Sequence, residues 1–313
     1  MKKILFAVLA IVFPAIVMAQ CPVPTSVTAT VTFKRNNVTP ALDGVFTIAS
    51  GTTVKFSRGN LQYKASTDTW QFAAHQYDII GADNASISSS YDGWIDLFGW
   101  ATGGNPASGT HYQPWDASTD NTYGNTAAPD YGDVLPLSSD WGRNMGAGWR
   151  TLTNDEWIYL LTTRSTAATI EGVSNARYVL ATIKTDGSGT EGIDYNIRGL
   201  IIFPDNYNQG TPVGVSWSSS SINTNNSIFD GTCATCTTEG WGALEDDGCV
   251  FLPCAGQRDG TTVSYVGTSG YYWSATASIS TYGRALDIPC GNNYTLIYTR
   301  HLGQSVRLVK EVE

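Results

Sequence analysis

The cysteines are the residues whose spacing most directly suggests chemistry. Cys233 and Cys236 are separated by two residues, and Cys249 and Cys254 by four. Two such pairs can hold a zinc ion, because thiolates bind zinc tetrahedrally. A chain with an export signal and only three histidines favours disulfides instead. We therefore expect two disulfides among these four residues, in any of three connectivities. Two further cysteines either pair with each other or stay as thiols: Cys21 and Cys290.

Residue patterns typical of enzymes are missing from the sequence. No G-x-S-x-G, H-E-x-x-H or G-x-x-x-x-G-K element stands at the required spacing. The histidines His75, His111 and His301 are dispersed and indicate no metal centre. The neighbouring carboxylates Asp246 and Asp247 come at the end of an expected helix, where a solvated turn is a better interpretation than glycosidase chemistry. We expect no catalytic residues, with an enzyme of unrecognised type as the weaker alternative.

Oxygen donors in several loops leave calcium binding open. Carboxylate and amide oxygens are the ligands that calcium prefers, but their spacing here is not that of an EF-hand loop. The candidate donors are Asp83, Asn84, Asp92, Asp205 and Asn206. We predict no cofactor, with calcium as the one ion that the sequence leaves open.

The segment 274–303 has an unusual composition, because it contains no Lys, Glu, Gln, Met or Trp. None of these five amino acids can be encoded by a codon that ends in a pyrimidine. Adenine-directed mutagenesis of Asn-type codons, as in diversity-generating retroelements, would leave such a gap. The alternative interpretation is an ordinary β-hairpin, which is naturally rich in Thr, Tyr, Ile and Gly.

The same segment carries the predicted ligand-binding face. It joins two expected strands, Tyr271–Ser274 and Ser305–Val309, which a core can hold while the side chains between them vary. Tyrosine and asparagine offer contact area and hydrogen bonds at a modest entropic cost. The predicted ligand-binding residues are Tyr282, Arg284, Asp287, Asn292, Asn293, Tyr294, Tyr298, Arg300 and His301.

Composition and charge exclude several classes of protein. The chain has 313 residues, with 18 Lys and Arg against 27 Asp and Glu and a net charge of −9, which argues against nucleic-acid binding. Apolar residues make up 42% and aromatic residues 12%, too many for an intrinsically disordered chain. The abundant Gly, Trp and Tyr are typical of a secreted domain with many turns.

The first residues have the pattern of a signal peptide. Lys2 and Lys3 precede the apolar run Ile4–Met18, and Ala19 is a small residue at the expected cleavage position. This run is shorter than the roughly 20 residues of a transmembrane helix, and no longer apolar run follows it. We predict a signal peptide at 1–19, export to the periplasm, cell surface or medium, and no transmembrane segment in the mature chain.

Periodicity predicts one α+β domain over residues 42–313, after a lead-in segment at 20–41. Thr153 and Glu156 have the spacing of a capping box and predict a helix that buries Trp157. A second short helix is expected over 238–246. The rest predicts long irregular loops and short strands at Val45–Ile48, Val54–Ser57, Tyr178–Ile183, Ile197–Phe203, Cys249–Leu252, Arg284–Ile288 and Tyr294–Tyr298, besides the two strands named above.

Seven segments together resemble a known group of bacterial surface proteins. They are VKFSRGNLQY (54–63), YDGWIDLFGW (91–100), WRTLTNDEW (149–157), GLIIFPDN (199–206), VFLPCAGQR (250–258), GYYWS (270–274) and QSVRLV (304–309). In this order they are similar to paralogous surface proteins with the Fib-succ-major type of domain. These proteins share the C-type-lectin fold with formylglycine-generating enzymes and with the variable proteins of diversity-generating retroelements.

The resemblance implies a C-type-lectin-like fold over 42–313, with two helices, a last strand that returns beside the first, and ligand contact between GYYWS and QSVRLV. The formylglycine-generating enzymes need a reactive cysteine in an Arg/Gly/Ser-rich setting, which Cys290 lacks. The Glu-Pro-Asn and Trp-Asn-Asp triplets of calcium-dependent lectins are also missing.

We therefore expect an exported recognition or adhesion protein that displays a variable C-terminal face to a glycan or protein ligand. The alternative class is a structural or assembly subunit of a surface appendage, joined through its N-terminal lead-in. An exposed cluster of tyrosines with His301 would favour the first class. An unpaired, extended N-terminal strand would favour the second.

Overall fold

The computed structural model describes residues 40–104, 113–120, 132–184, 196–224, 233–289 and 294–312. It is mostly β-sheet, with 39% strand and 15% helix. The expected α+β, C-type-lectin-like fold is therefore wrong. The strands fall into several small sheets, and the two α-helices have only five and nine residues. The sequence, rich in β-branched residues, aromatic residues and glycine, favours short strands and turns over a helical layer.

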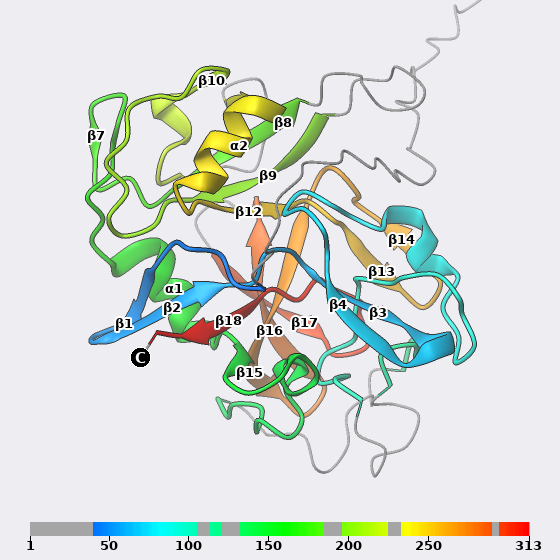
Figure 1. Cartoon of the computed structure of the whole chain (residues 1–313). Helices are drawn as coiled ribbons and strands as arrows, with labels where there is room; N and C mark the ends of the chain where they lie inside the picture. The colour runs from blue at the N-terminus through cyan, green and yellow to red at the C-terminus, as the bar shows by residue number, and fades with distance from the viewer. Residues whose placement is uncertain are drawn as a thin grey trace, which may run out of the picture.

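The C-terminal strand returns to the N-terminal hairpin. The first sheet has the order β1-β2-β18-β5, and β18 pairs antiparallel with both β2 and β5. Figure 1 shows β18 beside β2. Gly51, with φ of 77°, supplies the left-handed residue that the β1–β2 turn requires. The strands of this sheet are β1 (Phe46–Ala49), β2 (Thr52–Phe56), β18 (Leu308–Glu311) and β5 (Trp149–Thr151).

The predicted capping box begins helix α1 (Asn154–Ile158). The backbone N–H of Glu156 donates to the Thr153 hydroxyl, and the N–H of Thr153 donates to the Glu156 carboxylate. Trp157 is fully buried against Phe56, as predicted. The α-helix ends at Ile158, and one turn of π-helix continues it over Tyr159–Thr163.

The second sheet has the order β10-β11-β8-β9-β12. Only the β11–β8 pair is parallel, and helix α2 (Thr238–Asp246), which has the predicted bounds, connects β11 to β12. Trp241 and Leu244 of α2 are buried. The strands are β8 (Tyr178–Lys184), β9 (Asn196–Ile202), β10 (Val215–Ser216), β11 (Ala234–Thr237) and β12 (Val250–Pro253).

The third sheet carries most of the predicted ligand-binding residues. Its order is β15-β16-β17, with both pairs antiparallel: β15 (Gly270–Ile279), β16 (Tyr282–Ile288) and β17 (Thr295–Thr299). Three two-stranded ribbons complete the described fold: β3 (Leu61–Lys64) with β4 (Thr69–Phe72), β6 (Thr169–Ile170) with β7 (Val173–Ser174), and β13 (Gln257–Asp259) with β14 (Thr262–Ser264). Among the described residues, no helix has the length and apolar character needed to cross a membrane.

Candidate functional site

The predicted ligand-binding residues lie on β16, on β17 and directly beside these strands. Asn292 and Asn293 lie outside the described residues. The register places Tyr282 opposite Thr299, and Arg284 opposite Ile297. Directly opposed side chains in an antiparallel pair point to the same face of the sheet. These four side chains therefore share one face, which we call the outer face.

The outer face is partly open to solvent. The Ile297 side chain is 52% exposed, and the other three residues of this face are half-buried. Ile279, at the end of β15, is opposite Tyr282 and is 47% exposed. The interpretation of the segment as a ligand face thus applies to Tyr282 and Arg284. The sequence prediction did not include Ile297 and Thr299. The alternation of side chains along the two strands could have placed these residues on the same face as Tyr282 and Arg284.

The opposite face of the same sheet is closed by aromatic rings. Gly283 lies so close to the Trp100 indole that a Cβ there would approach it to 2.6 Å. The Tyr298 ring packs between Tyr271 and Trp273, at centroid distances of 5.4 and 6.5 Å. This side of the sheet is interior packing, so Tyr298 supports the sheet from behind rather than from the outer face.

Asp287 is buried and is hydrogen-bonded to Tyr298, so it is not part of an exposed face. Its carboxylate accepts a hydrogen bond of 2.5 Å from the Tyr298 hydroxyl, and the residue is 8% exposed. Burial raises the pKa of Asp287, and the hydrogen bond from Tyr298 opposes part of that rise. The prediction of Asp287 as a surface ligand contact is therefore not supported.

Arg300 is also structural. It is 1% exposed, and its guanidinium donates to the carbonyls of Ile279 and Tyr282 at 2.7 and 3.2 Å. The same group stacks over the Trp100 ring at 4.3 Å from its centroid. A planar guanidinium can satisfy several acceptors and stack at once. Arg300 thereby holds the end of β15 against the start of β16.

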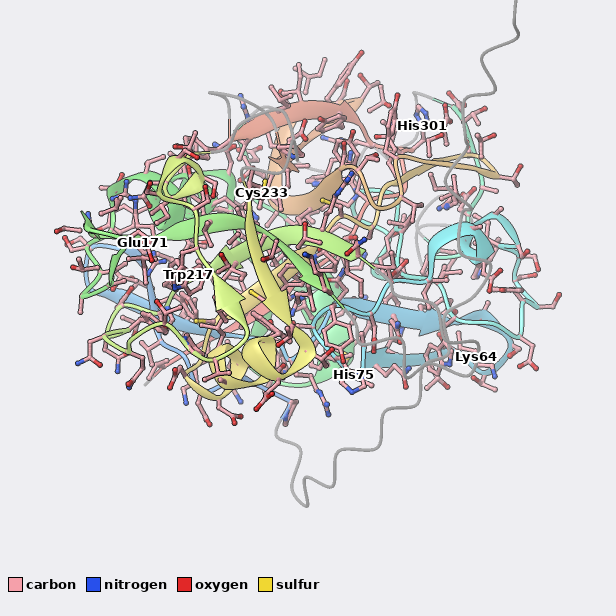
Figure 2. The ribbon with its side chains drawn as sticks, turned by 90° about the horizontal axis from the view of Figure 1, so that it is seen from above. Lys64, His75, Glu171, Trp217, Cys233 and His301 are labelled. Atoms are coloured by element: carbon pink, nitrogen blue, oxygen red, sulfur yellow. The ribbon has the colours of Figure 1, made fainter. Side chains whose placement is uncertain are left out.

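His301 and Tyr294 also have partners within the structure. His301 is 8% exposed, and its Nε2 is 3.4 Å from a carboxylate oxygen of Asp259 in β13 (Figure 2). Burial lowers the pKa of His301, and Asp259 opposes that effect. The Tyr294 hydroxyl accepts a hydrogen bond of 2.9 Å from the Tyr178 hydroxyl. The exposed cluster of tyrosines with His301 that would mark a recognition surface is therefore not formed.

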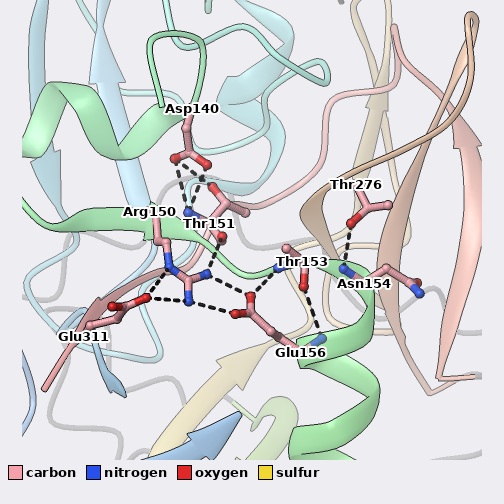
Figure 3. A network of polar contacts seen from close by, with 8 residues as sticks. All are labelled: Asp140, Arg150, Thr151, Thr153, Asn154, Glu156, Thr276 and Glu311. Carbon is pink, nitrogen blue, oxygen red and sulfur yellow. Dashed lines mark hydrogen bonds and ion pairs between the residues drawn. The ribbon is translucent and has the colours of Figure 1, made fainter. Parts of the chain in front are cut away.

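A polar network fixes the third sheet to the first sheet and to α1. The guanidinium of Arg150 in β5 makes a bidentate pair with the Glu156 carboxylate, with N–O distances of 2.7 and 2.8 Å (Figure 3). The same guanidinium is 3.2 Å from a carboxylate oxygen of Glu311. The backbone N–H of Asn154 donates to the hydroxyl of Thr276 in β15 at 2.9 Å. These contacts position the strands behind the outer face, and they give Arg150 a structural role.

The four predicted disulfide cysteines form no disulfide. Cys233, Cys236, Cys249 and Cys254 are all buried thiols (Figure 2 labels Cys233). Cys236 belongs to β11 and Cys233 directly precedes it, whereas Cys249 and Cys254 flank β12. Strands β8 and β9 lie between β11 and β12. Strands spaced by about 4.8 Å place β11 and β12 about 14 Å apart in the sheet. A disulfide spans a Cα separation of less than about 7 Å.

Burial also makes these thiols poor nucleophiles. It raises the pKa of Cys236 to about 12, and it raises the pKa of Cys249 and of Cys254 as well. The thiolate is the reactive form, so these side chains have the character of small core residues. The sequence spacing of the cysteines did not reveal this, because the sheet order separates the two pairs. Cys21 and Cys290 lie outside the described residues.

Three of the five loop residues considered for calcium have other partners. Asp92 forms an ion pair of 2.9 Å with Lys64. Asp205 forms one of 2.7 Å with the buried Arg164. Asn84 is buried, and its side chain bonds to Asp96. In the part of the chain that the structure describes, no group of three or more His, Cys, Asp or Glu side chains could hold a metal ion.

Comparison of the chain with models of protein families, with curated proteins and with solved structures found no match.

Proposed function

We propose that this chain is an exported recognition protein that binds a glycan or protein ligand on the outer face of β16 and β17. One observation carries the proposal. Tyr282, Arg284, Ile297 and Thr299 share a partly exposed face, while Trp100, Trp273 and Tyr298 hold the same two strands from behind. A scaffold of this kind keeps its fold when the outward side chains change.

The chemistry of the outer face suits binding rather than catalysis. It combines an aromatic ring, a guanidinium, an exposed aliphatic side chain and a hydroxyl, which together offer contact area and hydrogen-bond donors. The carboxylate and the imidazole that were expected there, those of Asp287 and His301, are buried. The face therefore lacks a general base of its own among the described residues.

The test is binding of the mature chain to glycan and protein arrays, with Tyr282→Ser/Arg284→Ser as the variant. We expect this double variant to lose binding while its Tm stays within a few degrees of the parent. Tyr265→Ser is the matched control, because Tyr265 is 55% exposed and lies outside the face. Retained binding in the double variant would move the ligand site elsewhere, most reasonably to the Trp-rich loops around Trp94 to Trp115.

Diversification of the C-terminal segment belongs to the same proposal. Substitutions on the outer face leave the core intact, whereas Ala277, Ala285 and Leu286 are fully buried and tolerate little change. A diversified population should therefore vary at Tyr282, Arg284, Ile297 or Thr299 and stay constant at the buried positions. Sequencing of the gene region would test this: a near-repeat of the 3′ end beside a reverse transcriptase gene is expected.

Export is the remaining part of the proposal. N-terminal sequencing of protein from the native host should find Gln20 as the first residue. A chain that starts at Met1, or one that carries a lipid on Cys21, would contradict it.

A second candidate function, an assembly subunit, is favoured by the open edge of β17.

A further inference from the structure

Strand β17 ends the third sheet with an open edge. The backbone N–H of Asp287 donates to the carbonyl of Tyr294, and the N–H of Arg300 donates to the carbonyl of Thr281. Hydrogen-bonded pairs alternate along an antiparallel ladder, so Leu296 and Tyr298 also direct their backbone groups toward β16. The N–H and C=O groups of the residues between them therefore point away from the sheet: Thr295, Ile297 and Thr299.

These outward groups have almost no partners. Apart from the carbonyl of Thr299, which accepts a hydrogen bond from Leu302, none of them is hydrogen-bonded within the part of the chain that the structure describes. The strand Thr-Leu-Ile-Tyr-Thr contains no charged residue and no proline, the usual protections of an exposed edge. Every residue of β17 is half-buried or exposed.

Other strand edges of this molecule are covered. At β12, Phe251 is bonded to the side chains of Gln76 and Arg307. At β1, the N–H of Thr47 donates to the carboxylate of Asp205. The free side of β15 pairs with residues 132–135. Unlike these three edges, the edge of β17 is uncovered among the described residues, and an extended strand would complete its hydrogen bonding.

We propose that the open edge of β17 binds residues 26–33 of a second copy of this chain. These residues read Ser-Val-Thr-Ala-Thr-Val-Thr-Phe, a strict alternation of polar and apolar side chains with no charge and no proline. Such a pattern predicts a β-strand, and eight residues exceed the five of β17. The segment lies outside the described residues and within the lead-in at 20–41.

The chain path favours a second copy over the same copy. The described chain begins at Pro40, whose carbonyl accepts a hydrogen bond from Arg58, at the end of β2. Asn60, in the same region as Pro40, is hydrogen-bonded to Tyr272 of β15. In the third sheet, β15 and β16 therefore lie between Pro40 and the open edge of β17. The six residues 34–39 reach about 20 Å when fully extended, and they would have to pass around the sheet. Between copies, a head-to-tail contact of this kind gives rings or open chains.

The experiment measures the assembly of the full mature chain by sedimentation velocity over a range of concentrations. We expect oligomers that grow with concentration, and dissociation on addition of excess synthetic peptide 25–34. Val31→Lys alters the inserted strand. Ile297→Pro removes an outward N–H but no bond to β16. Each variant should weaken assembly by about tenfold or more, as expected for loss of a central strand contact.

Two controls separate this edge from other surfaces. Val213→Pro changes a residue that is 82% exposed elsewhere, and Tyr282→Ser changes only the outer face. Both should assemble like the parent chain. A parent chain that stays monomeric at every concentration overturns the proposal, and so does a Val31→Lys chain that assembles normally. A monomer in which hydrogen exchange of β17 is slow, and becomes fast in Val31→Lys, shows docking within one copy and also overturns it.

Discussion

The hydroxyl of Tyr298 in β17 donates a hydrogen bond of 2.5 Å to the buried carboxylate of Asp287 in β16, the middle strand of the third sheet. The two residues were both expected on an exposed face. Their contact closes the inner side of the sheet instead, and it leaves only the outer side for a ligand.

We expect Tyr298→Phe to lower the free energy of unfolding by about 1–3 kcal/mol, because it removes a hydrogen bond to a buried carboxylate. The ring packing against Tyr271 and Trp273 remains in this variant. Urea unfolding followed by tryptophan fluorescence would measure the change. Tyr282→Phe is the control, since Tyr282 lies on the outer face, and it should change stability by less than about 0.5 kcal/mol. Equal effects of the two substitutions would contradict the assignment of faces.

Trp157→Ala should cost about 3–5 kcal/mol, the range for truncating a large aromatic side chain in a core. Trp157 is fully buried between the first sheet and α1, and its ring is 6.0 Å from that of Phe56. Ile158→Ala is a matched control on the same helix, because Ile158 is 37% exposed. A loss of under about 1 kcal/mol at Trp157 would mean that the helix is peripheral to the core.

Asp96 should make the protein less stable as the pH rises from about 4 to 6. Burial raises the pKa of Asp96 from 3.8 to about 6, and hydrogen bonds from Asn84 and Ile80 only partly oppose this. Between these values the unfolded chain has lost the proton that the folded chain keeps, so the free energy of unfolding falls with pH. The full effect is about 3 kcal/mol and is complete above pH 6.

Urea unfolding of Asp96→Asn at several pH values would isolate that effect. The asparagine does not titrate, so the variant should lose the dependence between pH 4 and 6 that the parent shows. Asp83→Asn, an exposed change in the same loop, should keep the parental dependence. If the free energy of unfolding depends on pH in the same way in the parent and in Asp96→Asn, the raised pKa of Asp96 is contradicted.

The four cysteines of the second sheet should react with iodoacetamide only after unfolding. Cys236 and Cys254 are both 1% exposed, and their raised pKa values keep them as thiols at neutral pH. Mass spectrometry of the native and of the denatured, unreduced protein would show the difference as four added alkyl groups. Cross-linked peptides containing Cys233, Cys236, Cys249 or Cys254 in the unreduced protein would instead restore the disulfide interpretation.

Local patterns determined the local structure of this protein. The capping box at Thr153 and Glu156, the burial of Trp157 and the bounds of α2 follow from contacts between residues three or four positions apart. Most of the expected strands are found for a similar reason, because alternation and turn residues act within a few positions.

Only the tertiary structure decided the fold class, the state of the cysteines and the side of the sheet that each predicted site residue occupies. Arg300 became structural because Trp100, two hundred positions earlier in the chain, lies beneath its guanidinium. The cysteines stay as thiols in a sheet whose order places β8 and β9 between β11 and β12. Such contacts depend on how distant segments are ordered in space, and a side-chain pattern read along the chain carries no signal of that order.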